Sequence, residues 1–220
     1  MPIHLANDHK TGDGVALAKL YGWPNTYVFT KAMGEMLVGQ LRGNLPVVIM
    51  RPTIVCSTLM EPFPGWVEGC RTIDSVAIPA DMFVNSIIVA MKAHINDPNL
   101  TIYQVGSSHR NPVTFNELRE FHYAYFTKNP WTDHEVTLNF QQMLFNLQKK
   151  LKIATKLVDL YKPYLFFKAC NFTDTNSEKL LTNAREKDLD EEVFNFDPLC
   201  VNWEDYFINI HLPAIVKYLF

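Results

Sequence analysis

The sequence predicts an α/β arrangement in its first half and a mostly helical second half. Up to residue 112, segments with helical character alternate with short apolar runs rich in β-branched residues, which is typical of layered α/β domains. After residue 112, apolar residues recur at intervals of three and four, which is typical of amphipathic helices. We therefore predict two domains, residues 1–112 and residues 113–220.

The first predicted helix spans residues 27–41. Asn25 or Thr26 is placed to cap its N terminus, because both side chains can accept a hydrogen bond from a free backbone N–H. The roughly 20 residues at the start are mostly polar and are interrupted by Gly12 and Gly14. We expect them to form a loop.

Two short runs predict β-strands, at residues 45–50 and 101–106. The first is continuously apolar, as in a strand buried on both faces of a parallel sheet. Residues 52–69 contain several prolines and glycines and are expected to form a loop. A helix from about residue 79 to residue 96 follows, so the order of elements resembles that of a βαβ unit.

The second half carries three helix signals. Thr114 and Glu117 form a capping-box pattern that starts a helix through Tyr125. Apolar residues between positions 140 and 158 step by three and four. The last stretch, residues 203–220, is also helix-like, although Pro213 interrupts it. We interpret Trp203 and His211 in this stretch as packing residues.

Composition excludes several classes of function. A net charge of −3 gives no electrostatic basis for nucleic-acid binding. No run approaches the roughly 18 apolar residues of a membrane-spanning helix, and the start lacks a signal-peptide pattern. The four cysteines form no C-x-x-C pair and no H-E-x-x-H occurs, so we expect reduced thiols and no metal site. These features predict an intracellular protein that is soluble or lies on a membrane surface.

One motif indicates chemistry: Tyr27-Val28-Phe29-Thr30-Lys31, a Y-x-x-x-K. Residues four apart on a helix share a face, so the two end side chains would lie together. A lysine cation beside a phenol favours the phenolate. A tyrosine tuned in this way can donate or accept a proton while a hydride moves at an adjacent carbon, as in short-chain dehydrogenases and reductases.

The same spacing occurs at Tyr164 and Lys168, so spacing alone does not identify a site. Tyr27 lies at the start of a helix that precedes a predicted buried strand, whereas Tyr164 follows a proline in a helical region. We therefore select Tyr27 and Lys31 as the candidate catalytic pair. We interpret Tyr164 as a core aromatic and Lys168 as a solvated lysine.

Five blocks of sequence carry a resemblance to a known family; they span residues 21–35, 45–55, 61–66, 105–108 and 203–211. Several blocks are long and unusual, and the match extends from about residue 16 to the last residue. Together they resemble the plant-type alcohol-forming fatty acyl-CoA reductases, which belong to the extended short-chain dehydrogenases and reductases.

The resemblance implies an activity and a set of site residues. The activity is the NADPH-dependent reduction of a long-chain fatty acyl-CoA, through an aldehyde, to a primary alcohol. Tyr27 would be the general acid at the reacting carbonyl, and Lys31 would favour its phenolate and hold a ribose hydroxyl of the cofactor. The backbone of Pro52, Thr53 and Ile54 would flank the nicotinamide.

The resemblance also implies a fold for each half. Residues 1–112 would be the C-terminal part of a Rossmann-like NAD(P)-binding domain, containing the active-site helix and the strands that follow. Residues 113–220 would be the family's helical C-terminal domain, with a role in acyl binding or peripheral membrane contact. The protein would then work at the periphery of the endoplasmic reticulum or in the cytoplasm, with a plastid form possible for a full-length chain.

The sequence departs from the family pattern in two places. Only 26 residues precede Tyr27, fewer than the roughly 30 of one βαβ unit. We therefore expect truncation at the N terminus, without the Gly-rich turn that holds the cofactor pyrophosphate, and no measurable reductase activity from this chain alone. The second departure follows Ile78, where the family carries a Gly-containing connecting segment that this chain lacks.

Two other functions are compatible with these residues. A sugar-nucleotide epimerase would share the Y-x-x-x-K motif and the Arg51-Pro52 loop, but such enzymes lack the block at residues 61–66 and the helical tail. A non-catalytic fragment would instead bind lipid or a full-length relative. The basic run Lys149, Lys150, Lys152 and Lys156 is compatible with contacts to anionic lipid or to CoA phosphates, although nearby acidic residues favour a solvated helix face.

Overall fold

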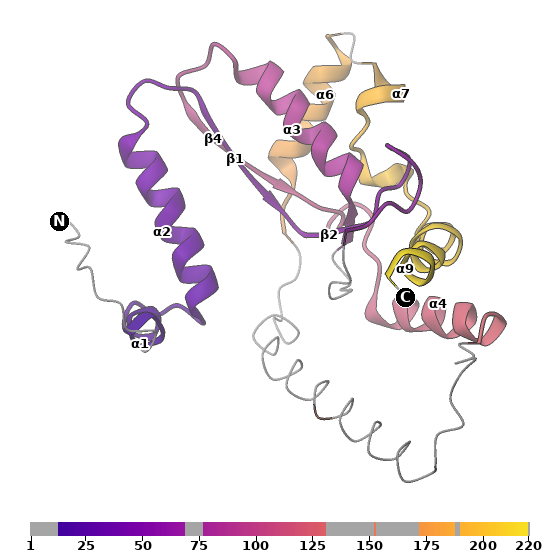
Figure 1. The fold of residues 1–220 in the computed structure, drawn as a ribbon. Coiled ribbons are helices and arrows are strands. Elements are labelled where there is room, and N and C mark those ends of the chain that lie inside the picture. Colours follow the sequence, from indigo (N-terminus) through magenta and orange to yellow (C-terminus); the bar gives the residue numbers. More distant parts are fainter. Residues whose placement is uncertain (1–12, 69–76, 131–151, 153–171, 188–189, 220) are drawn as a thin grey trace. The chain divides into compact units, whose positions relative to one another are not determined.

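The computed structural model describes residues 13–68, 77–130, 152, 172–187 and 190–219 (Figure 1). Contacts divide the chain into two compact units, Met1–Leu45 and Pro46–Phe220, and each is described by itself. This division falls at a different point from residue 112, and the two-domain arrangement stays a prediction.

The first unit contains helix α1 (Asp13–Leu20) and helix α2 (Thr26–Leu41). Helix α2 confirms the helix predicted at residues 27–41, and Asn25 is its N-cap. The Asn25 Oδ1 accepts a hydrogen bond of 2.9 Å from the backbone N–H of Val28. This bond satisfies one of the donors that a helix start leaves free.

Helix α1 corrects the expectation of a loop before Tyr21, since Gly14 lies inside the helix. A glycine lowers helix stability by about 1 kcal/mol relative to alanine, which is why the sequence indicated a break. Packing offsets that cost: α1 contacts α2, and the Ala18 side chain is buried. Tertiary contact, which a local pattern does not reveal, decides this segment.

The second unit is built on two short parallel strand pairs, β1 (Val47–Pro52) with β4 (Leu100–Val105), and β2 (Ile54–Cys56) with β3 (Ala77–Pro79). Strand β1 leads into β2 through a single residue, Thr53. Helix α3 (Ala80–His94) connects β3 to β4, so β1, α3 and β4 form the predicted βαβ order.

Two predictions about the strands need correction. Strand β1 starts and ends two residues later than the predicted run 45–50, and its apolar side chains are half-buried rather than buried on both faces. Among the residues that the structure describes, β4 is the only strand hydrogen-bonded to β1. Strand β2 lies within the stretch 52–69 that the prolines and glycines predicted to be loop.

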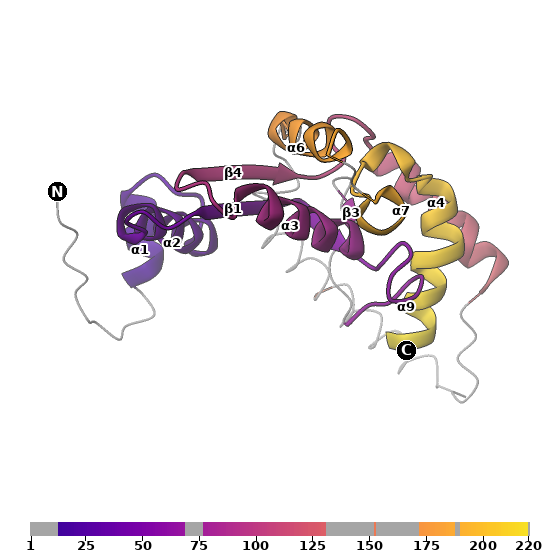
Figure 2. The same ribbon diagram turned by 90° about the horizontal axis from the view of Figure 1, so that it is seen from above.

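Helices cover the strands of this unit. Helix α3 contacts β1, helix α6 (Thr175–Arg185) contacts β4, and the two helices also contact each other (Figure 2). The buried faces of these elements contribute Val89, Tyr103 and Leu180 to one hydrophobic core. These contacts are the reason that a short sheet can be stable in this unit.

The described residues after Val113 are helical where they form regular structure. Helix α4 (Phe115–Lys128) confirms the capping box: the Thr114 Oγ1 accepts from the Glu117 N–H, and the Glu117 carboxylate accepts from the Thr114 N–H. Short turns α7 (Glu191–Phe194) and η1 (Pro198–Cys200) follow α6. The helical spacing at residues 140–158, most of the basic run 149–156, and the pair Tyr164 and Lys168 lie outside the described residues.

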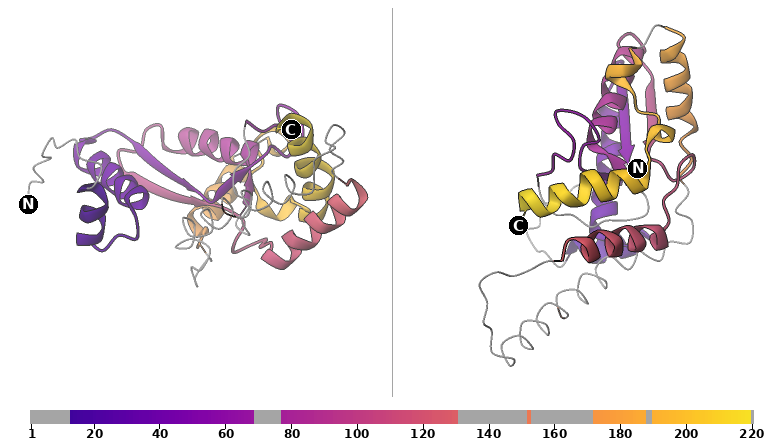
Figure 3. Two further views of the ribbon diagram at one scale, coloured as in Figure 1. Left: turned by 60° about the horizontal axis from the view of Figure 1, so that its bottom comes forward. Right: turned by 90° about the vertical axis from the view of Figure 1, so that its right-hand side faces the viewer.

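The C-terminal helix accommodates Pro213 because a wider, π-helical turn precedes it. It consists of α8 (Trp203–Asp205), the π-helical η2 (Tyr206–His211) and α9 (Leu212–Leu219), and η2 packs against α4 (Figure 3). The N–H of Leu212 donates to the carbonyl of Phe207, five residues earlier. Pro213 has no N–H to donate, and the π turn just before it spares the helix the usual clash with a preceding carbonyl.

Candidate active site

Tyr27 and Lys31 lie on one face of α2, as the motif predicted. The Lys31 Nζ lies 5.8 Å from the centroid of the Tyr27 ring. Both side chains are exposed, Tyr27 to 63%. The Val28 N–H donates to the Asn25 Oδ1, so this N-cap hydrogen bond spans Tyr27 in the first turn of α2.

The predicted cofactor-binding segment lies in the second unit, where β1 passes into β2. Pro52 ends β1, Ile54 begins β2, and Thr53 lies between them. The Thr53 N–H donates to the Val105 carbonyl at 2.9 Å, which continues the β1–β4 ladder by one bond. The structure thus groups Pro52, Thr53 and Ile54 at one strand end, and it places the Tyr27–Lys31 pair in the other unit.

The Thr53 hydroxyl is the polar group of this segment that lacks a partner. Its Oγ1 is buried and forms no hydrogen bond with any residue that the structure describes. A buried hydroxyl without a partner costs about 1–3 kcal/mol, so a ligand group that forms a hydrogen bond with it would gain from this position. The segment therefore fits a polar group of a bound cofactor.

Gly106 is the residue that allows Thr53 to take this position. A Cβ at residue 106 would lie 2.3 Å from the Thr53 Cγ2 and 2.7 Å from its Oγ1. Both distances are far shorter than van der Waals contact, so only glycine fits at the end of β4. The sequence contained this glycine in the block 105–108, but nothing local showed that it faces Thr53.

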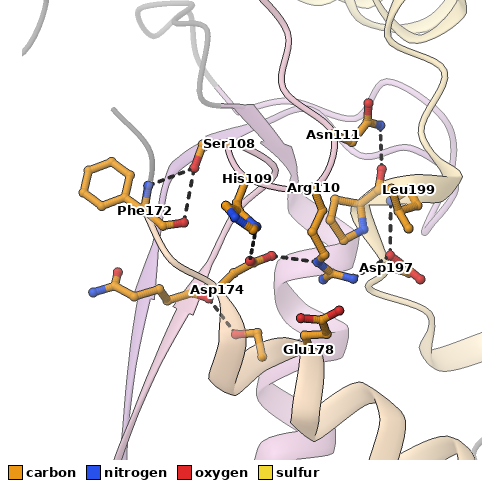
Figure 4. Close-up of polar contacts among 12 residues, drawn as sticks. Ser108, His109, Arg110, Asn111, Phe172, Asp174, Glu178, Asp197 and Leu199 are labelled. Atoms are coloured by element: carbon orange, nitrogen blue, oxygen red, sulfur yellow. Dashed lines mark hydrogen bonds and ion pairs between the residues drawn. The ribbon is translucent and has the colours of Figure 1, made fainter. Parts of the chain in front are cut away.

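The loop that follows β4 is held by an arginine between two carboxylates (Figure 4). The Arg110 Nε donates to Asp174 at 2.8 Å, and its Nη1 donates to Asp197 at 2.9 Å. The Asp174 side chain is only 4% exposed, and Arg185 gives Asp197 a second cation at 3.3 Å. Buried carboxylates of this kind are stable only when they are paired.

Further side chains fix the same loop at both ends. The Ser107 Oγ donates to the Ala77 carbonyl, and the Ser108 hydroxyl bonds the backbone of Phe172 (Figure 4). The Asn111 amide donates to the carbonyls of Pro198 and Val201. These contacts hold the loop beside Gly106, the residue that packs against Thr53.

A second buried polar cluster joins the end of β2 to the C-terminal helix. The Tyr206 hydroxyl donates to the Ser57 carbonyl at 2.7 Å, and the Ser57 Oγ lies 2.8 Å from the His211 Nδ1. Burial raises the pKa of Tyr206 well above its usual value. Burial, and secondarily the charge of His122, lower the pKa of His211 to about 4. Both rings are thus uncharged at neutral pH and stack on each other, which agrees with the packing role predicted for His211; its Nε2 has no partner among the described residues.

Trp203 has the packing role that the sequence predicted. Its side chain is buried, and its Nε1–H donates to the Asn111 carbonyl at 2.9 Å. The C-terminal helix therefore contacts both the loop after β4 and the strand end at Ser57.

Asp81, at the start of α3, holds the segment after Ser57. Its carboxylate accepts hydrogen bonds from the backbone N–H groups of Leu59, Met60 and Glu61. The local sequence does not show this role, because the residues that Asp81 binds lie 20 to 22 positions away. Among the described residues, no group of three histidine, cysteine, aspartate or glutamate side chains could hold a metal ion.

Comparisons with known proteins decide the family. Two family models, both described as male sterility protein, match residues 2–98 and residues 134–220, and the first is an NAD-binding domain. The alcohol-forming fatty acyl-CoA reductase of Simmondsia chinensis is 40% identical over 94% of this chain and 54% of its own length. The fatty acyl-CoA reductase 1 of Arabidopsis thaliana has the same identity and the same coverage of both chains. The chain belongs to the fatty acyl-CoA reductase family.

The comparisons also show how much of the family this chain represents. It spans about half the length of these plant relatives. Fatty acyl-CoA reductase 2 of Bos taurus is 29% identical over 91% of the chain and 49% of its own length. The alignment with the Simmondsia chinensis reductase runs over 268 positions, more than the 220 residues of the chain, so that relative has internal residues that the chain lacks. The location of such a gap after Ile78 stays a prediction.

The family match confirms the coarse fold. An NAD-binding domain match over residues 2–98 agrees with the parallel strand pairs and the βαβ order, so this part has an α/β, Rossmann-like fold that serves a nicotinamide cofactor. The separate helical C-terminal domain stays a prediction. None of the described helices is long and apolar enough to cross a membrane.

Proposed function

We propose that this protein reduces long-chain fatty acyl-CoA to a primary alcohol with NADPH, and that Tyr27 and Lys31 carry the proton chemistry. The observation that supports the proposal most is the pairing of Tyr27 with Lys31 on the N-capped helix α2, inside the segment that matches an NAD-binding domain. Relatives with 40% identity are named alcohol-forming fatty acyl-CoA reductase and fatty acyl-CoA reductase 1.

The proposed roles follow from the chemistry of each side chain. The Tyr27 phenol donates a proton to the carbonyl oxygen as a hydride reaches the carbonyl carbon. The Lys31 ammonium stabilises the phenolate that remains and donates a hydrogen bond to a ribose hydroxyl. When the thiohemiacetal loses CoA as the thiolate, its hydroxyl proton would return to the Tyr27 phenolate and an aldehyde would remain. A second hydride at the carbonyl carbon and a second proton from Tyr27 would then give the alcohol.

Pro52, Thr53 and Ile54 would hold the nicotinamide end of the cofactor, which supplies the hydride in both steps. The Thr53 Oγ1 is the group that supports this assignment, because it is buried without a partner among the described residues. A nicotinamide carboxamide or a ribose hydroxyl would satisfy it.

The test combines cofactor binding with turnover on the purified chain. Calorimetry measures NADPH binding, and product analysis measures the alcohol formed from a long-chain acyl-CoA. Tyr27→Phe should lower turnover by roughly 10²–10⁴-fold and leave NADPH affinity unchanged, since a general acid contributes about that much. Tyr123→Phe is the matched control, because Tyr123 is 75% exposed on α4 and has no proposed role.

Each outcome decides between two functions. Turnover that falls in Tyr27→Phe but not in Tyr123→Phe supports the proposal and overturns the expectation that the chain alone is inactive. Equal turnover in both variants contradicts the role of Tyr27. If the chain shows no NADPH binding and no turnover, the second candidate is favoured: a non-catalytic protein that associates with lipid or with a full-length relative. Co-precipitation with that relative then tests this function.

The remaining expectations stay proposals. We expect contact with the endoplasmic reticulum surface or a cytoplasmic location, and fractionation of cells that express the tagged chain tests this.

A further inference from the structure

A cavity of about 410 Å³ lies between α3, β4 and α6. Pockets that bind small molecules are typically roughly 300–1,000 Å³, so this volume is within their range. Apolar side chains such as Val89, Ala93, Leu180 and Ala184 line part of it, and Asn176 and Asn183 bring amide groups. An apolar surface with a few convergent polar groups is the usual composition of a ligand site.

The charges that line the cavity all have one sign. Lys92 comes from α3, Lys179 from α6, and Lys187 from the segment just after α6, and none of the lining residues is acidic. None of the three lysines forms an ion pair within the part of the chain that the structure describes. Glu178 and Glu186 precede two of these lysines in sequence but do not line the cavity. A concave site with several cations attracts anions more strongly than a flat surface does.

One wall of the cavity is fixed by a chain of hydrogen bonds. The His94 imidazole lies 3.0 Å from the Asp97 carboxylate through Nδ1 and 2.6 Å from the Tyr103 hydroxyl through Nε2. Asp97 also accepts hydrogen bonds from Asn99, which leaves its carboxylate occupied. The Asp97 carboxylate is thus engaged by His94 and Asn99, and the hydrogen bond between His94 and Tyr103 joins α3 to β4 at this wall.

The cavity lies away from the segment assigned to the cofactor. It reaches Thr101 and Tyr103 in β4 and the carboxyl end of α3, whereas Thr53 bonds Val105 at the carboxyl end of β4. Tyr103 lies two positions before Val105, roughly 7 Å along the strand, and Thr101 lies four positions before it, roughly 13 Å. Ligands of open α/β sheets usually bind at the carboxyl ends of the strands, so this cavity is not the expected place for the cofactor.

We propose that this cavity binds a soluble phosphate ester of about nucleotide size. The three lysines would hold the phosphate groups, and the apolar surface around Val89 and Leu180 would hold the remainder of the ligand. The proposal uses neither Tyr27 nor the Pro52–Ile54 segment, so it does not depend on the residues assigned to the reductase chemistry.

The test is calorimetric titration of the 220-residue chain with adenosine 3′,5′-bisphosphate and, separately, with inorganic pyrophosphate. A triple variant, Lys92→Gln, Lys179→Gln and Lys187→Gln, removes the charges. A matched triple variant, Lys19→Gln, Lys128→Gln and Lys217→Gln, makes the same change in net charge at residues that do not line the cavity. Ala93→Phe fills the cavity and keeps every lysine, and because Ala93 is exposed the variant should fold.

The expected result is specific to the cavity. The lysine triple variant and Ala93→Phe should each weaken adenosine 3′,5′-bisphosphate binding by at least about tenfold, and the matched triple variant by less than about twofold. Similar weakening in both triple variants would mean that only net charge attracts the nucleotide, and it would overturn the proposal. So would the absence of binding by both ligands.

Vesicles of phosphatidylglycerol and of phosphatidylcholine separate a membrane surface from a soluble ligand. Co-sedimentation with phosphatidylglycerol that the lysine triple variant abolishes and Ala93→Phe retains, without nucleotide binding, would make the lysines a membrane-contact surface and overturn the proposal. Unfolding midpoints close to that of the unmodified chain confirm that each variant folds, since all three lysines are exposed.

Discussion

Helix α2 and the strand ends around Thr53 differ in how firmly their surroundings hold them. Helix α2 has no buried residue, and its candidate catalytic tyrosine is 63% exposed. Residues 105–108, at the end of β4, are buried, and Gly106, Ser107 and Arg110 each contact a partner far away in sequence. The Y-x-x-x-K motif thus lies on a lightly packed helix, whereas the segment assigned to the cofactor lies between two strands and packs against the buried end of β4.

This difference separates two kinds of experiment. Substitutions on α2 should change activity with little effect on the unfolding of the second unit. Substitutions around the strand ends should change stability first, because each removes a buried contact. The following predictions test this comparison, from the largest expected effect to the smallest.

Arg110→Ala should cause the largest loss of stability. It leaves the Asp174 carboxylate, 4% exposed, without the arginine that lies 2.8 Å away. Breaking a buried ion pair from one side costs about 3–5 kcal/mol. Urea unfolding followed by circular dichroism measures the loss, and Arg119→Ala on α4 is the matched control, with an expected change within about 0.5 kcal/mol. A small effect of Arg110→Ala would show that water or rearrangement compensates Asp174.

Stability should fall in mild acid because of His211. Its pKa is lowered from 6.5 to about 4 on folding, so between these pH values the unfolded chain binds a proton at His211 and the folded chain does not. The neutral His211 contributes to the free energy of unfolding above about pH 6.5, and this contribution is lost as the pH falls toward 4. About 2 kcal/mol is lost between about pH 7.5 and pH 5. Urea unfolding at both pH values measures this loss.

His211→Phe should flatten that pH dependence, because it removes the titrating group and keeps a ring against Tyr206. An unchanged slope in His211→Phe would assign the acid sensitivity to another group.

Gly106→Ala should destabilise the second unit by about 1–3 kcal/mol, the usual cost of overpacking. Thr53→Ala in the same chain should restore part of the loss, because it removes the two Thr53 atoms nearest to the new methyl group. Gly39→Ala in α2 is the opposing control: a Cβ there meets nothing within 4 Å, so the variant should gain about 0.5–1 kcal/mol of helix stability. Loss of stability in both glycine variants would contradict the contrast between the two regions.

Asn25→Ala should have the smallest effect, about 1 kcal/mol on α2 alone, because it removes the N-cap. Hydrogen exchange of the Val28 amide is the measurement, since that N–H donates to Asn25. Thr26→Ala should leave the exchange rate nearly unchanged, because Thr26 lies inside the helix rather than at its cap. Faster exchange in Thr26→Ala would assign part of the cap to Thr26.

Local sequence was sufficient for the elements that depend on neighbours in the chain. It predicted α2 and its cap at Asn25, and the capping box of Thr114 and Glu117. It was wrong for α1, where a contact with α2 offsets the cost of Gly14. It also missed β2, because three residues between prolines form a strand only when β3 lies beside them.

The candidate site also contains a part that the local sequence predicts and a part that it does not. The pairing of Tyr27 with Lys31 follows from a spacing of four residues on a helix, which the sequence displays directly. The contacts that fix Thr53 do not. Gly106 faces it across 53 positions, and Arg110 reaches carboxylates 64 and 87 positions away. A single sequence does not show which of its distant charges and glycines meet.

The π turn at Tyr206–His211 makes the C-terminal helix intolerant of small changes in length. Each residue of an α-helix advances the next by about 100°, so one residue removed from this turn would rotate all of α9 by about that amount. Ala214 and Ile215, now buried, would then turn toward solvent, and the ring of Pro213 would meet the backbone that the wide turn avoids. A single-codon deletion here should therefore be more harmful than most substitutions at the same positions, although every remaining residue would still favour a helix.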